Sequence, residues 1–413
     1  MKLTFVSNYF NHHQSPVSEA FAHTKGVEYT FIQTEDMEEE RVRMGWAVDI
    51  SLYPYVKIWK GNEEECRTLI MDSDVVIWGG LEMEEEIEPR LLANKLTFRY
   101  SERIYKEGQW KFISPRGLKK KYHDHVRYNK SNVYLLCAGA FVGSDFKLIH
   151  AYPGKKFVWG YFPEVRHYDI DELMAKKSRK GEPVRLFWAG RMIGWKHPEF
   201  AIEAADKMLH GGGQIRADLT GAYIEDGFVL TMAGGGEMEE ELKRMVKEKG
   251  LEKVVRFTGF MSPKEIRAEM EKSDIFLFTS DAKEGWGAVL NEAMNSGCMV
   301  VARPQIGAVP YMVQQGWNGA AVDDNVSGFC RAVINWALNR DGCRELGRRA
   351  YDTMIKYWNA DNAVPQFLRV AKSPLAGDGF EYSEKEKESG ALQPMCKDPE
   401  IRPSMGARFI RRW

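Results

Sequence analysis

Short apolar runs alternate along the chain with longer segments whose apolar residues recur every three or four positions. The short runs are apolar throughout, not at every second position, which favours strands buried on both faces of a parallel sheet. Ten such runs form two series of five. The first series is 3–7, 27–33, 74–80, 96–101 and 133–139, and the second is 184–190, 228–236, 254–260, 274–280 and 298–303.

The segments between these runs carry helix signals. Residues 198–209 and 237–250 have helical periodicity, and the second of them ends on Gly250, a residue type common just past a helix. In 261–273, Ser262 and Pro263 suit the N-cap and the first helical position. Strand–helix alternation that occurs twice predicts two doubly wound α/β domains.

The domain boundary is expected where the pattern becomes polar. We expect an N-terminal domain over residues 1–163, a linker over 164–183 and a C-terminal domain over 184–355. The last stretch, 373–413, is rich in Gly, Pro, Ser and charge without a period, so we expect it to be irregular or disordered.

Composition argues against several classes of protein. The 413 residues carry 58 Lys and Arg against 59 Asp and Glu, so no strong net field attracts nucleic acid. Six cysteines without CxxC spacing favour reduced thiols over a disulfide framework or a zinc site. The apolar opening is too short for a signal peptide, and no run reaches the ~20 apolar residues that span a bilayer. We expect a cytoplasmic protein, with peripheral contact at the inner face of the membrane left open.

The stretch DAKEGWGAVLNEAMNSG, 281–297, carries the strongest chemical signal. It follows a strand, presents Glu284 from a loop and places Glu292 roughly two turns into the helix that it opens. Gly285 and Gly287 allow close backbone approach, and free N–H groups at a helix start can bind an anion. Carboxylates accept hydrogen bonds from sugar hydroxyls, so a nucleotide sugar fits this order of groups. The alternative is a capped amphipathic helix with two exposed glutamates.

Three other loops of the second domain support a ligand. Arg191 and Lys196 are two cations on a loop before a helix, where they can clamp a diphosphate. Residues 234–236 form a glycine-rich turn, and Gly259 ends a strand where a base can pack on backbone. Each signal alone also fits ordinary turn geometry. All of them follow strands of one domain, at the edge where open sheets bind ligands.

These residues resemble the donor domain of glycosyltransferase family 4, whose members are retaining enzymes of the GT-B fold. The resemblance covers roughly residues 184 to 325 and runs in order through Arg191 and Lys196, Gly234 to Gly236, Phe257 to Gly259, 284–297, 307–310 and 316–319. It implies two Rossmann-like doubly wound domains that face a central cleft. It also implies a helix over 356–372 that crosses back to the first domain.

The resemblance also implies roles for single residues. As catalytic residues, Arg191 and Lys196 would neutralise the donor diphosphate, and Glu284 would bond hydroxyls of the donor sugar. Because charge develops on the leaving phosphate, such cations can lower the barrier without a metal, so we expect neither metal nor cofactor. The implied donor-binding set is Gly190, Gly234, Gly235, Gly259, Phe260, Trp286, Gly287, Ala288, Val289 and Glu292, with Glu292 on the ribose hydroxyls.

The first domain, which binds the acceptor in this family, resembles its relatives less. Many of them have a glycine-rich loop after the first strand, and a later histidine that touches the donor sugar. Here the loop is replaced by NHHQ, and the place of the histidine corresponds to Ser101, Glu102 or Arg103. A purely structural loop is the alternative for the histidines. The acceptor or cleft candidates are Asn11, His12, His13, Gln14, Ser101, Glu102 and Arg103.

Two further motifs lie in the first domain. DSD at 72–74 looks like a metal-binding DxD motif, but its place before an apolar run favours a helix-to-strand turn. KKKYHDHVRYNK, 119–130, is a basic segment with interleaved tyrosines that could rest on anionic lipid, and its His123 and His125 are a second place for histidine chemistry. The alternative for this segment is a solvated basic surface.

The function expected is retaining, metal-independent transfer of a hexosyl unit from a nucleotide diphosphate sugar, with a UDP-sugar favoured. The acceptor would be a hydroxyl of a glycan or of a lipid-linked acceptor in cell-surface polysaccharide synthesis. Two alternatives stay open, a GT-B sugar-nucleotide epimerase and a non-catalytic partner that binds a nucleotide or glycan.

Overall fold

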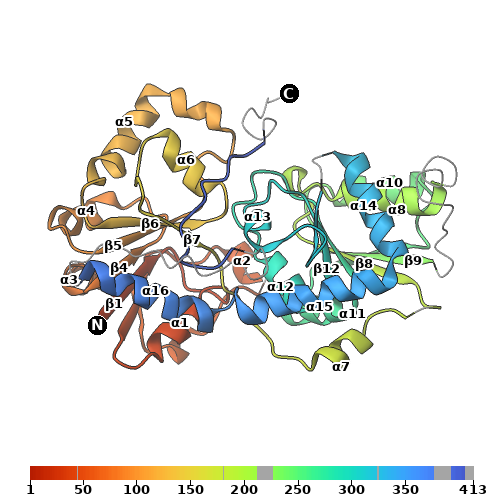
Figure 1. Cartoon of the computed structure of the whole chain (residues 1–413), viewed down its shortest axis with the longest axis horizontal. Helices are drawn as coiled ribbons and strands as arrows, with labels where there is room; N and C mark the ends of the chain where they lie inside the picture. Colours follow the sequence, from red (N-terminus) through yellow and green to blue (C-terminus); the bar gives the residue numbers. More distant parts are fainter. Residues whose placement is uncertain (44, 180, 212–226, 323–324, 376–391, 405–413) are drawn as a thin grey trace. The chain divides into compact units, whose positions relative to one another are not determined.

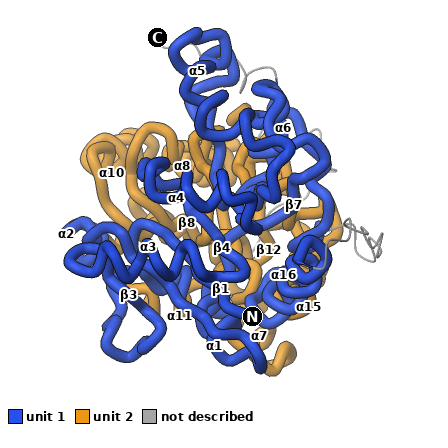
Figure 2. Tube along the Cα trace, turned by 90° about the vertical axis from the view of Figure 1, so that its left-hand side faces the viewer, with its two compact units in different colours: residues 1–164, 357–413 blue, residues 165–356 orange. Residues whose placement is uncertain are grey.

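The computed structural model describes residues 1–43, 45–179, 181–211, 227–322, 325–375 and 392–404. The chain forms two compact units, coloured separately in Figure 2. Unit 1 comprises residues 1–164 and 357–413, and unit 2 comprises residues 165–356. Each unit is built on one parallel sheet.

Unit 1 contains seven parallel strands in the order β3-β2-β1-β4-β5-β6-β7. All five strands predicted for the first domain are present, as β1, β2, β4, β5 and β6. The pattern missed β3 and β7, which are short and contain a lysine each. The bounds are β1 Lys2–Ser7, β2 Glu28–Gln33, β3 Val56–Ile58, β4 Val75–Trp78, β5 Thr97–Ser101, β6 Val133–Ala138 and β7 Lys156–Trp159.

Helices cover both faces of this sheet. On one face, α3 (Glu63–Asp72), α4 (Glu84–Leu92) and α6 (Val142–Leu148) form a core with inward side chains of the strands. On the other face lie α1 (Ser15–Ala22) and α16 (Ala360–Leu375), which pack side by side, as Figure 1 shows. Unit 1 is therefore a three-layer α/β/α domain.

Helix α16 returns to unit 1 after the chain has completed unit 2. Its Phe367 packs against Phe21 of α1 and Phe98 of β5, with ring centroids 5.4 and 4.7 Å away. Just before the helix, the fully buried Trp358 stacks on Phe162. The expected helix that crosses back to the first domain is confirmed.

The connections of unit 1 hold its shorter elements. Helix α3 ends at Asp72 and β4 begins at Val75, which confirms that DSD is a helix-to-strand turn. The Asp74 carboxylate accepts a hydrogen bond from the Lys2 amide, at 2.8 Å. The remaining elements are α2 Glu39–Arg43, η1 Ile50–Leu52, η2 Gln109–Ile113, α5 Pro115–Asp124 and η3 Val126–Tyr128.

Residues 392–404, within the stretch expected to be irregular or disordered, lie along the edge strand β7. The Met395 and Val158 amides donate to the Val158 and Cys396 carbonyls, each at 2.8 Å. The buried Asp398 packs so close to α6 that a Cβ on Gly143 would lie 2.2 Å from its Oδ1. This segment has no helix or strand of its own, yet it is fixed. Residues 376–391 and 405–413 lie outside the described residues.

Unit 2 contains six parallel strands in the order β10-β9-β8-β11-β12-β13. The five strands predicted for the second domain are β8 to β12. The two-residue β13 was not predicted because it is too short to form an apolar run. The bounds are β8 Val184–Ala189, β9 Phe228–Ala233, β10 Val255–Gly259, β11 Ile275–Phe278, β12 Met299–Ala302 and β13 Ala320–Ala321.

The helix boundaries of unit 2 follow the sequence signals. The Ser262 side chain caps α11 (Pro263–Lys272) in a capping box with Glu265. Helix α10 (Glu239–Glu248) ends just before Gly250, which has a φ of +63°. The others are α7 Ile170–Ala175, η4 Gly194–Lys196, α8 Glu199–His210, α12 Val289–Asn295, α13 Val309–Met312, α14 Val326–Leu338 and α15 Arg340–Lys356.

A buried cation collects carbonyl oxygens at the amino ends of the strands in unit 1. Arg90 of α4 is fully buried, and burial lowers its pKa to about 10. Its guanidinium donates across the last turn of α3 and the starts of two strands. The acceptors are the carbonyls of Ile70, Ser73, Asp74 and Leu96, at 2.7 to 3.2 Å.

Unit 2 has an equivalent cation. Lys177, which follows α7, is buried, and burial lowers the pKa of its ammonium group. It donates to three carbonyls at the ends of α11 and α12, where the helix dipole also favours a cation. The acceptors are Met270, Ser273 and Ser296, at 2.7 to 2.8 Å.

Candidate functional site

The strand order of unit 2 fixes where its ligand edge lies. From β8 the chain continues outward through β9 and β10, and it then returns to β11 on the other side of β8. The strand order therefore reverses between β8 and β11, and the loops after these two strands diverge at their carboxyl ends. Such a switch point is the usual ligand site of an open α/β sheet.

Backbone contacts hold the loops after β8, β9 and β10 together. The Met192 amide donates to the Gly235 carbonyl and the Gly234 amide to the Gly259 carbonyl, each at 2.8 Å. A Cβ on Gly234, which has a φ of +121°, would lie 1.9 Å from the carbonyl oxygen of Gly190. Glycine is therefore required at position 234 because any side chain would push these loops apart.

The two loops at the switch point meet through Lys196 and Glu284. The Lys196 ammonium contacts Oε2 of Glu284, and the Ser280 hydroxyl donates to the same oxygen at 2.9 Å. The Thr279 hydroxyl donates to the Lys196 carbonyl at 2.6 Å and accepts from the Trp188 indole at 2.8 Å. Within the described part of the chain, Oε1 of Glu284 accepts no hydrogen bond. It can therefore accept from a sugar hydroxyl.

His197 braces this arrangement. Its Nδ1 lies 2.7 Å from Glu199, and its Nε2 lies 3.6 Å from Asp281, whose amide donates to the Trp195 carbonyl. Burial lowers the pKa of His197, but the Asp281 and Glu199 carboxylates outweigh burial and raise it to about 9. At neutral pH the His197 side chain is therefore a cation, next to Lys196 in the chain. The residue has a φ of +48°, so it also turns the chain into α8.

The loop 285–288 differs from expectation in where its helix starts. Helix α12 begins at Val289, so Glu292 lies in its first turn, and the expectation of roughly two turns was wrong. The reason is Gly287, whose φ of +93° excludes an earlier helix start. A Cβ there would lie 2.4 Å from the Phe278 ring. Trp286 is fully buried and its indole donates to Asn291, so only its backbone can face a ligand.

Arg191 and Phe260 lie on the surface of these loops. Arg191 is exposed and forms no ion pair with any residue that the structure describes. Phe260 follows β10 with 66% of its surface exposed, and its ring borders Gly235, where an added Cβ would lie 3.1 Å away. An exposed aromatic ring beside glycine backbone can stack on a planar base.

The strand order of unit 1 reverses between β1 and β4, so the loop after β1 lies at its switch point. That loop is NHHQ. The rings of His12 and His13 are 3.9 Å apart, and both pack edge-on against Trp46. Asn11 shapes the loop by accepting the His13 amide at 2.8 Å, and the Gln14 side chain donates to Ser7 at 3.2 Å. Burial lowers the pKa of both histidines, so both are neutral at pH 7.

The three candidates after β5 have different surroundings. Glu102 accepts a hydrogen bond from the Tyr161 hydroxyl at 2.7 Å and contacts Lys106, and it remains partly exposed. Ser101 donates to the Glu102 carbonyl at 2.7 Å. Arg103 is buried, and Asp145 neutralises its charge at 3.2 Å. The Arg103 guanidinium therefore fastens this loop to α6.

Within unit 2 the structure brings together Lys196 and Glu284, and it joins the Gly190, Gly234, Gly235 and Gly259 backbones. Sequence reasoning missed His197, Ser280 and Asp281, which support that pair. It also missed Trp46 in unit 1. Their only signal was position, because the first three lie in or beside the quoted motifs and Trp46 is the lone aromatic residue of a charged stretch.

Comparison with known proteins shows which family the loops of unit 2 resemble. Residues 169–353 match the family of glycosyl transferases group 1, the segment that contains every loop described for unit 2. The matched segment covers a little under half of the 413 residues. Over this segment, the resemblance to glycosyltransferase family 4 is confirmed.

Curated relatives match this chain over part of their length. The GDP-mannose-dependent α-(1-6)-phosphatidylinositol monomannoside mannosyltransferase of Mycobacterium tuberculosis is 29% identical over 154 residues, 35% of this chain and 40% of that enzyme. The amylovoran biosynthesis glycosyltransferase AmsK of Erwinia amylovora is 29% identical over 33% of this chain and 32% of that protein. The matched region is thus less than half the length of these relatives.

Solved structures show the fold over nearly the whole chain. HepE of Anabaena, solved in complex with UDP, has a TM-score of 0.63 at 15% identity, covering 90% of this chain and 100% of that one. The predicted GT-B architecture of two parallel α/β domains is confirmed. Among the helices in the described residues, none combines the length and the apolar character that crossing a bilayer requires.

Proposed function

We propose that this protein is a retaining glycosyltransferase that moves a hexosyl unit from a nucleotide diphosphate sugar to a hydroxyl of a glycan or lipid-linked acceptor. The observation that carries the proposal is the contact between Lys196 and Glu284 at the switch point of unit 2. A cation and a carboxylate with one open oxygen suit the two ends of a sugar diphosphate.

The residues divide the work along the donor. As the bond between the anomeric carbon and the diphosphate breaks, its electron pair goes to the leaving oxygen. Lys196 and Arg191 neutralise the charge that develops there, so the step needs no metal. Oε1 of Glu284 accepts from hydroxyls of the donor sugar, and Glu292 accepts from the ribose. The base packs on Gly259 and Phe260.

We favour UDP as the nucleotide of the donor and cell-surface polysaccharide as the pathway. UDP is bound in the HepE structure, and AmsK is named for amylovoran biosynthesis. The mycobacterial relative is named for GDP-mannose, so GDP is the competing choice. A thermal-shift comparison of UDP, GDP and ADP decides between them, because the preferred nucleotide raises the melting temperature at the lowest concentration.

The decisive experiment measures release of nucleoside diphosphate from a panel of sugar nucleotides, with and without candidate acceptors. Release that depends on an acceptor supports transfer. Isomerisation of the donor without release would instead identify an epimerase, and nucleotide binding without either reaction would identify a non-catalytic partner. Activity that is unchanged by a chelator supports the metal-independent mechanism, and activity lost with the chelator and restored by a divalent cation contradicts it.

Variants test the residue roles. Lys196→Ala, Arg191→Ala and Glu284→Ala are each expected to lower kcat/KM by about 100-fold or more while the protein stays folded, because each removes charge stabilisation from the transition state. Lys283→Ala is the matched control, because Lys283 is a cation of the same loop with no assigned role. Rates near those of the wild type in all three variants would contradict the assignment.

A further inference from the structure

Large apolar side chains gather on the surface of unit 1 between β5 and β6. In the described part of the chain, eleven large hydrophobic side chains are exposed, and four of them lie within residues 110–122. We call these four the apolar ridge. They are Trp110, Ile113, Leu118 and Tyr122, with 44%, 66%, 38% and 60% of their surface exposed. Such clustering marks an interaction surface, since exposed apolar residues are normally scattered.

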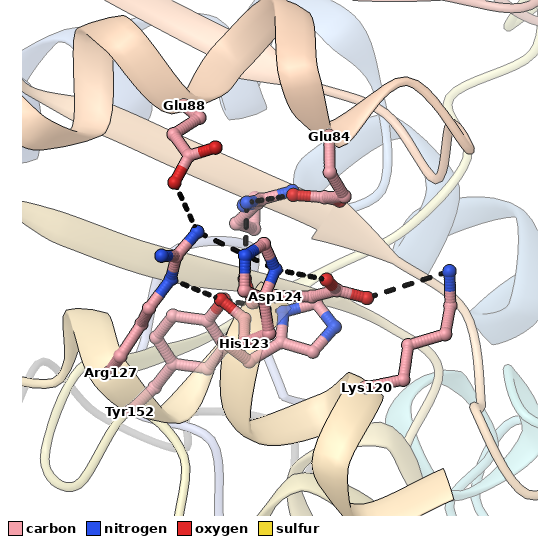
Figure 3. Close-up of polar contacts among 9 residues, drawn as sticks. Glu84, Glu88, Lys120, His123, Asp124, Arg127 and Tyr152 are labelled. Atoms are coloured by element: carbon pink, nitrogen blue, oxygen red, sulfur yellow. Dashed lines mark hydrogen bonds and ion pairs between the residues drawn. The ribbon is translucent and has the colours of Figure 1, made fainter. Parts of the chain in front are cut away.

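Polar contacts hold the C-terminal end of α5 in place, and Figure 3 shows those of Asp124 and Arg127. Arg99 of β5 pairs with Glu84 through two hydrogen bonds of 2.7 Å and also donates to the Asp124 carbonyl at 3.2 Å. Arg127 bonds Glu88 at 2.5 Å. These contacts fix the end of α5, so the ridge is held outward by the fold.

Within each of its two elements, the side chains of the ridge share one face. Leu118 and Tyr122 are four positions apart and therefore share one face of α5. Trp110 and Ile113 are three positions apart in η2, so they also share a face. Asp124, which is buried, lies on the opposite side of α5 from Pro115 and Tyr122. One side of the helix thus binds the domain and the other faces solvent.

Free positive charge flanks the ridge. Residues 109–130 contain seven Lys or Arg and one acidic residue, in a chain whose net charge is −1. Lys120 pairs with Asp124 at 3.7 Å, and Arg127 pairs with Glu88. Arg116 and Lys119 are exposed and form no ion pair with a described residue. These two unpaired cations lie on α5 beside the apolar side chains, and the buried Tyr128 takes no part.

We propose that the apolar ridge and its flanking cations dock unit 1 on a bilayer that contains anionic lipids. Tryptophan and tyrosine side chains are suited to the lipid–water interface, and lysine and arginine beside them are attracted to anionic headgroups. A soluble polyanion would use the cations but leave four apolar side chains in water. A lipid surface satisfies both.

The test is co-sedimentation of the full chain with vesicles of phosphatidylcholine, alone or mixed with phosphatidylglycerol. The wild type is expected to sediment with the mixed vesicles and to be released progressively by salt. Leu118→Glu combined with Tyr122→Glu is expected to reduce binding by about 10-fold or more, because it places two charges at the lipid boundary. Arg116→Glu combined with Lys119→Glu should have a similar effect, at roughly fivefold per lost charge.

Matched controls lie elsewhere on unit 1. Leu92→Glu changes a side chain that is 69% exposed, and Lys25→Glu with Lys60→Glu reverses two exposed lysines. These variants should bind mixed vesicles like the wild type. Because every altered residue is exposed, circular dichroism should report an unchanged fold.

Three results would overturn the proposal. The first is a wild type that does not sediment with the mixed vesicles. The second is undiminished binding by the Leu118→Glu and Tyr122→Glu variant. The third is binding to heparin, a soluble polyanion, that matches vesicle binding and ignores the two apolar substitutions. None of these assays needs a donor or an acceptor, so their outcome is independent of the proposed function.

Discussion

At the amino ends of their strands, both units bind the carbonyl oxygens of helix ends with a buried cation. Arg90 in unit 1 and Lys177 in unit 2 are buried cations that gather the carbonyl oxygens where helices end. At the carboxyl ends the units differ. Unit 2 builds its edge from glycine backbone and ion pairs, whereas unit 1 builds its edge from Asn11, two neutral histidines and Trp46.

The difference teaches what each edge can bind. An edge of backbone amides and cations at the strand ends suits a phosphate-bearing ligand. An edge of neutral imidazole and indole rings offers hydrogen bonds and stacking surfaces without net charge, which suits an uncharged sugar. The same sheet architecture thus presents two chemically distinct surfaces.

The largest expected loss of stability comes from a substitution in the glycine loops at the carboxyl edge of unit 2. Gly234→Ala must place a Cβ where the Gly190 carbonyl lies, in a backbone conformation that disfavours side chains. We expect a loss of about 4 kcal/mol in the free energy of unfolding of unit 2, measured by urea denaturation. Gly250→Ala is the control, because its φ is also positive but nothing lies within 4 Å of the added Cβ. Equal losses in the two variants would contradict the close-approach argument.

The next largest loss of stability is expected when the buried cation at the amino ends of the strands is removed from either unit. Arg90→Met and Lys177→Met each leave buried carbonyls without a donor, and we expect each to cost about 3 kcal/mol. Hydrogen exchange read by mass spectrometry should assign the loss to unit 1 for Arg90 and to unit 2 for Lys177. The exposed lysines Lys25 and Lys253 provide controls, since Lys→Met there should change stability by less than about 0.5 kcal/mol.

A pH series separates the histidines of the two units. The pKa of His197 is raised to about 9, so its stabilisation is complete below about 6.5 and is lost as the pH rises through 9. We expect His197→Asn to cost about 2 kcal/mol near pH 6 and little above pH 9.5, in urea titrations against the wild type. Asparagine tolerates the positive φ, so the backbone is retained.

The histidines of unit 1 should show the opposite sign. Their pKa values are lowered by burial, so the wild-type loop loses stability as the pH falls below about 6.5. His13→Asn should reduce that acid sensitivity, and His12→Asn combined with His13→Asn should remove it. A wild type whose stability is independent of acid down to about pH 5 would show that these rings are not buried as described.

The smallest effect concerns binding at the edge of unit 1. His12→Ala and His13→Ala should raise the KM of the acceptor or donor several-fold, with less than about 1 kcal/mol lost in stability, because each removes one neutral hydrogen-bonding ring. His23→Ala is the control, since that imidazole is exposed at the end of α1. If kcat and both KM values stay at wild-type levels, the NHHQ loop is structural.

Apolar runs predicted ten strands because a strand buried on both faces has a strong local signature. The Ser262 cap and the Gly250 stop were predictable for the same reason, since each acts within one helical turn. Lys196 and Glu284 could be named from their motifs. Their mutual contact could not, because it depends on β8 and β11 being neighbours, which is a property of strand order.

Other features were hidden because they depend on distant partners. Trp46 is 33 positions beyond His13, and no local pattern connects the two. His197 reads as an ordinary loop residue until Asp281 lies beside it. In the sequence, the apolar ridge could be recognised only as part of a basic segment. Its apolar residues look like core positions until their exposure is known.

The segment 392–404 has a consequence for how the protein is made. Its hydrogen bonds close the β7 edge of the unit 1 sheet, but the ribosome makes it only after all of unit 2. Throughout that interval the nascent first domain presents an unpaired strand edge to its surroundings, and such edges recruit other strands. The edge of β7 therefore stays exposed during synthesis until residues 392–404 pair with it.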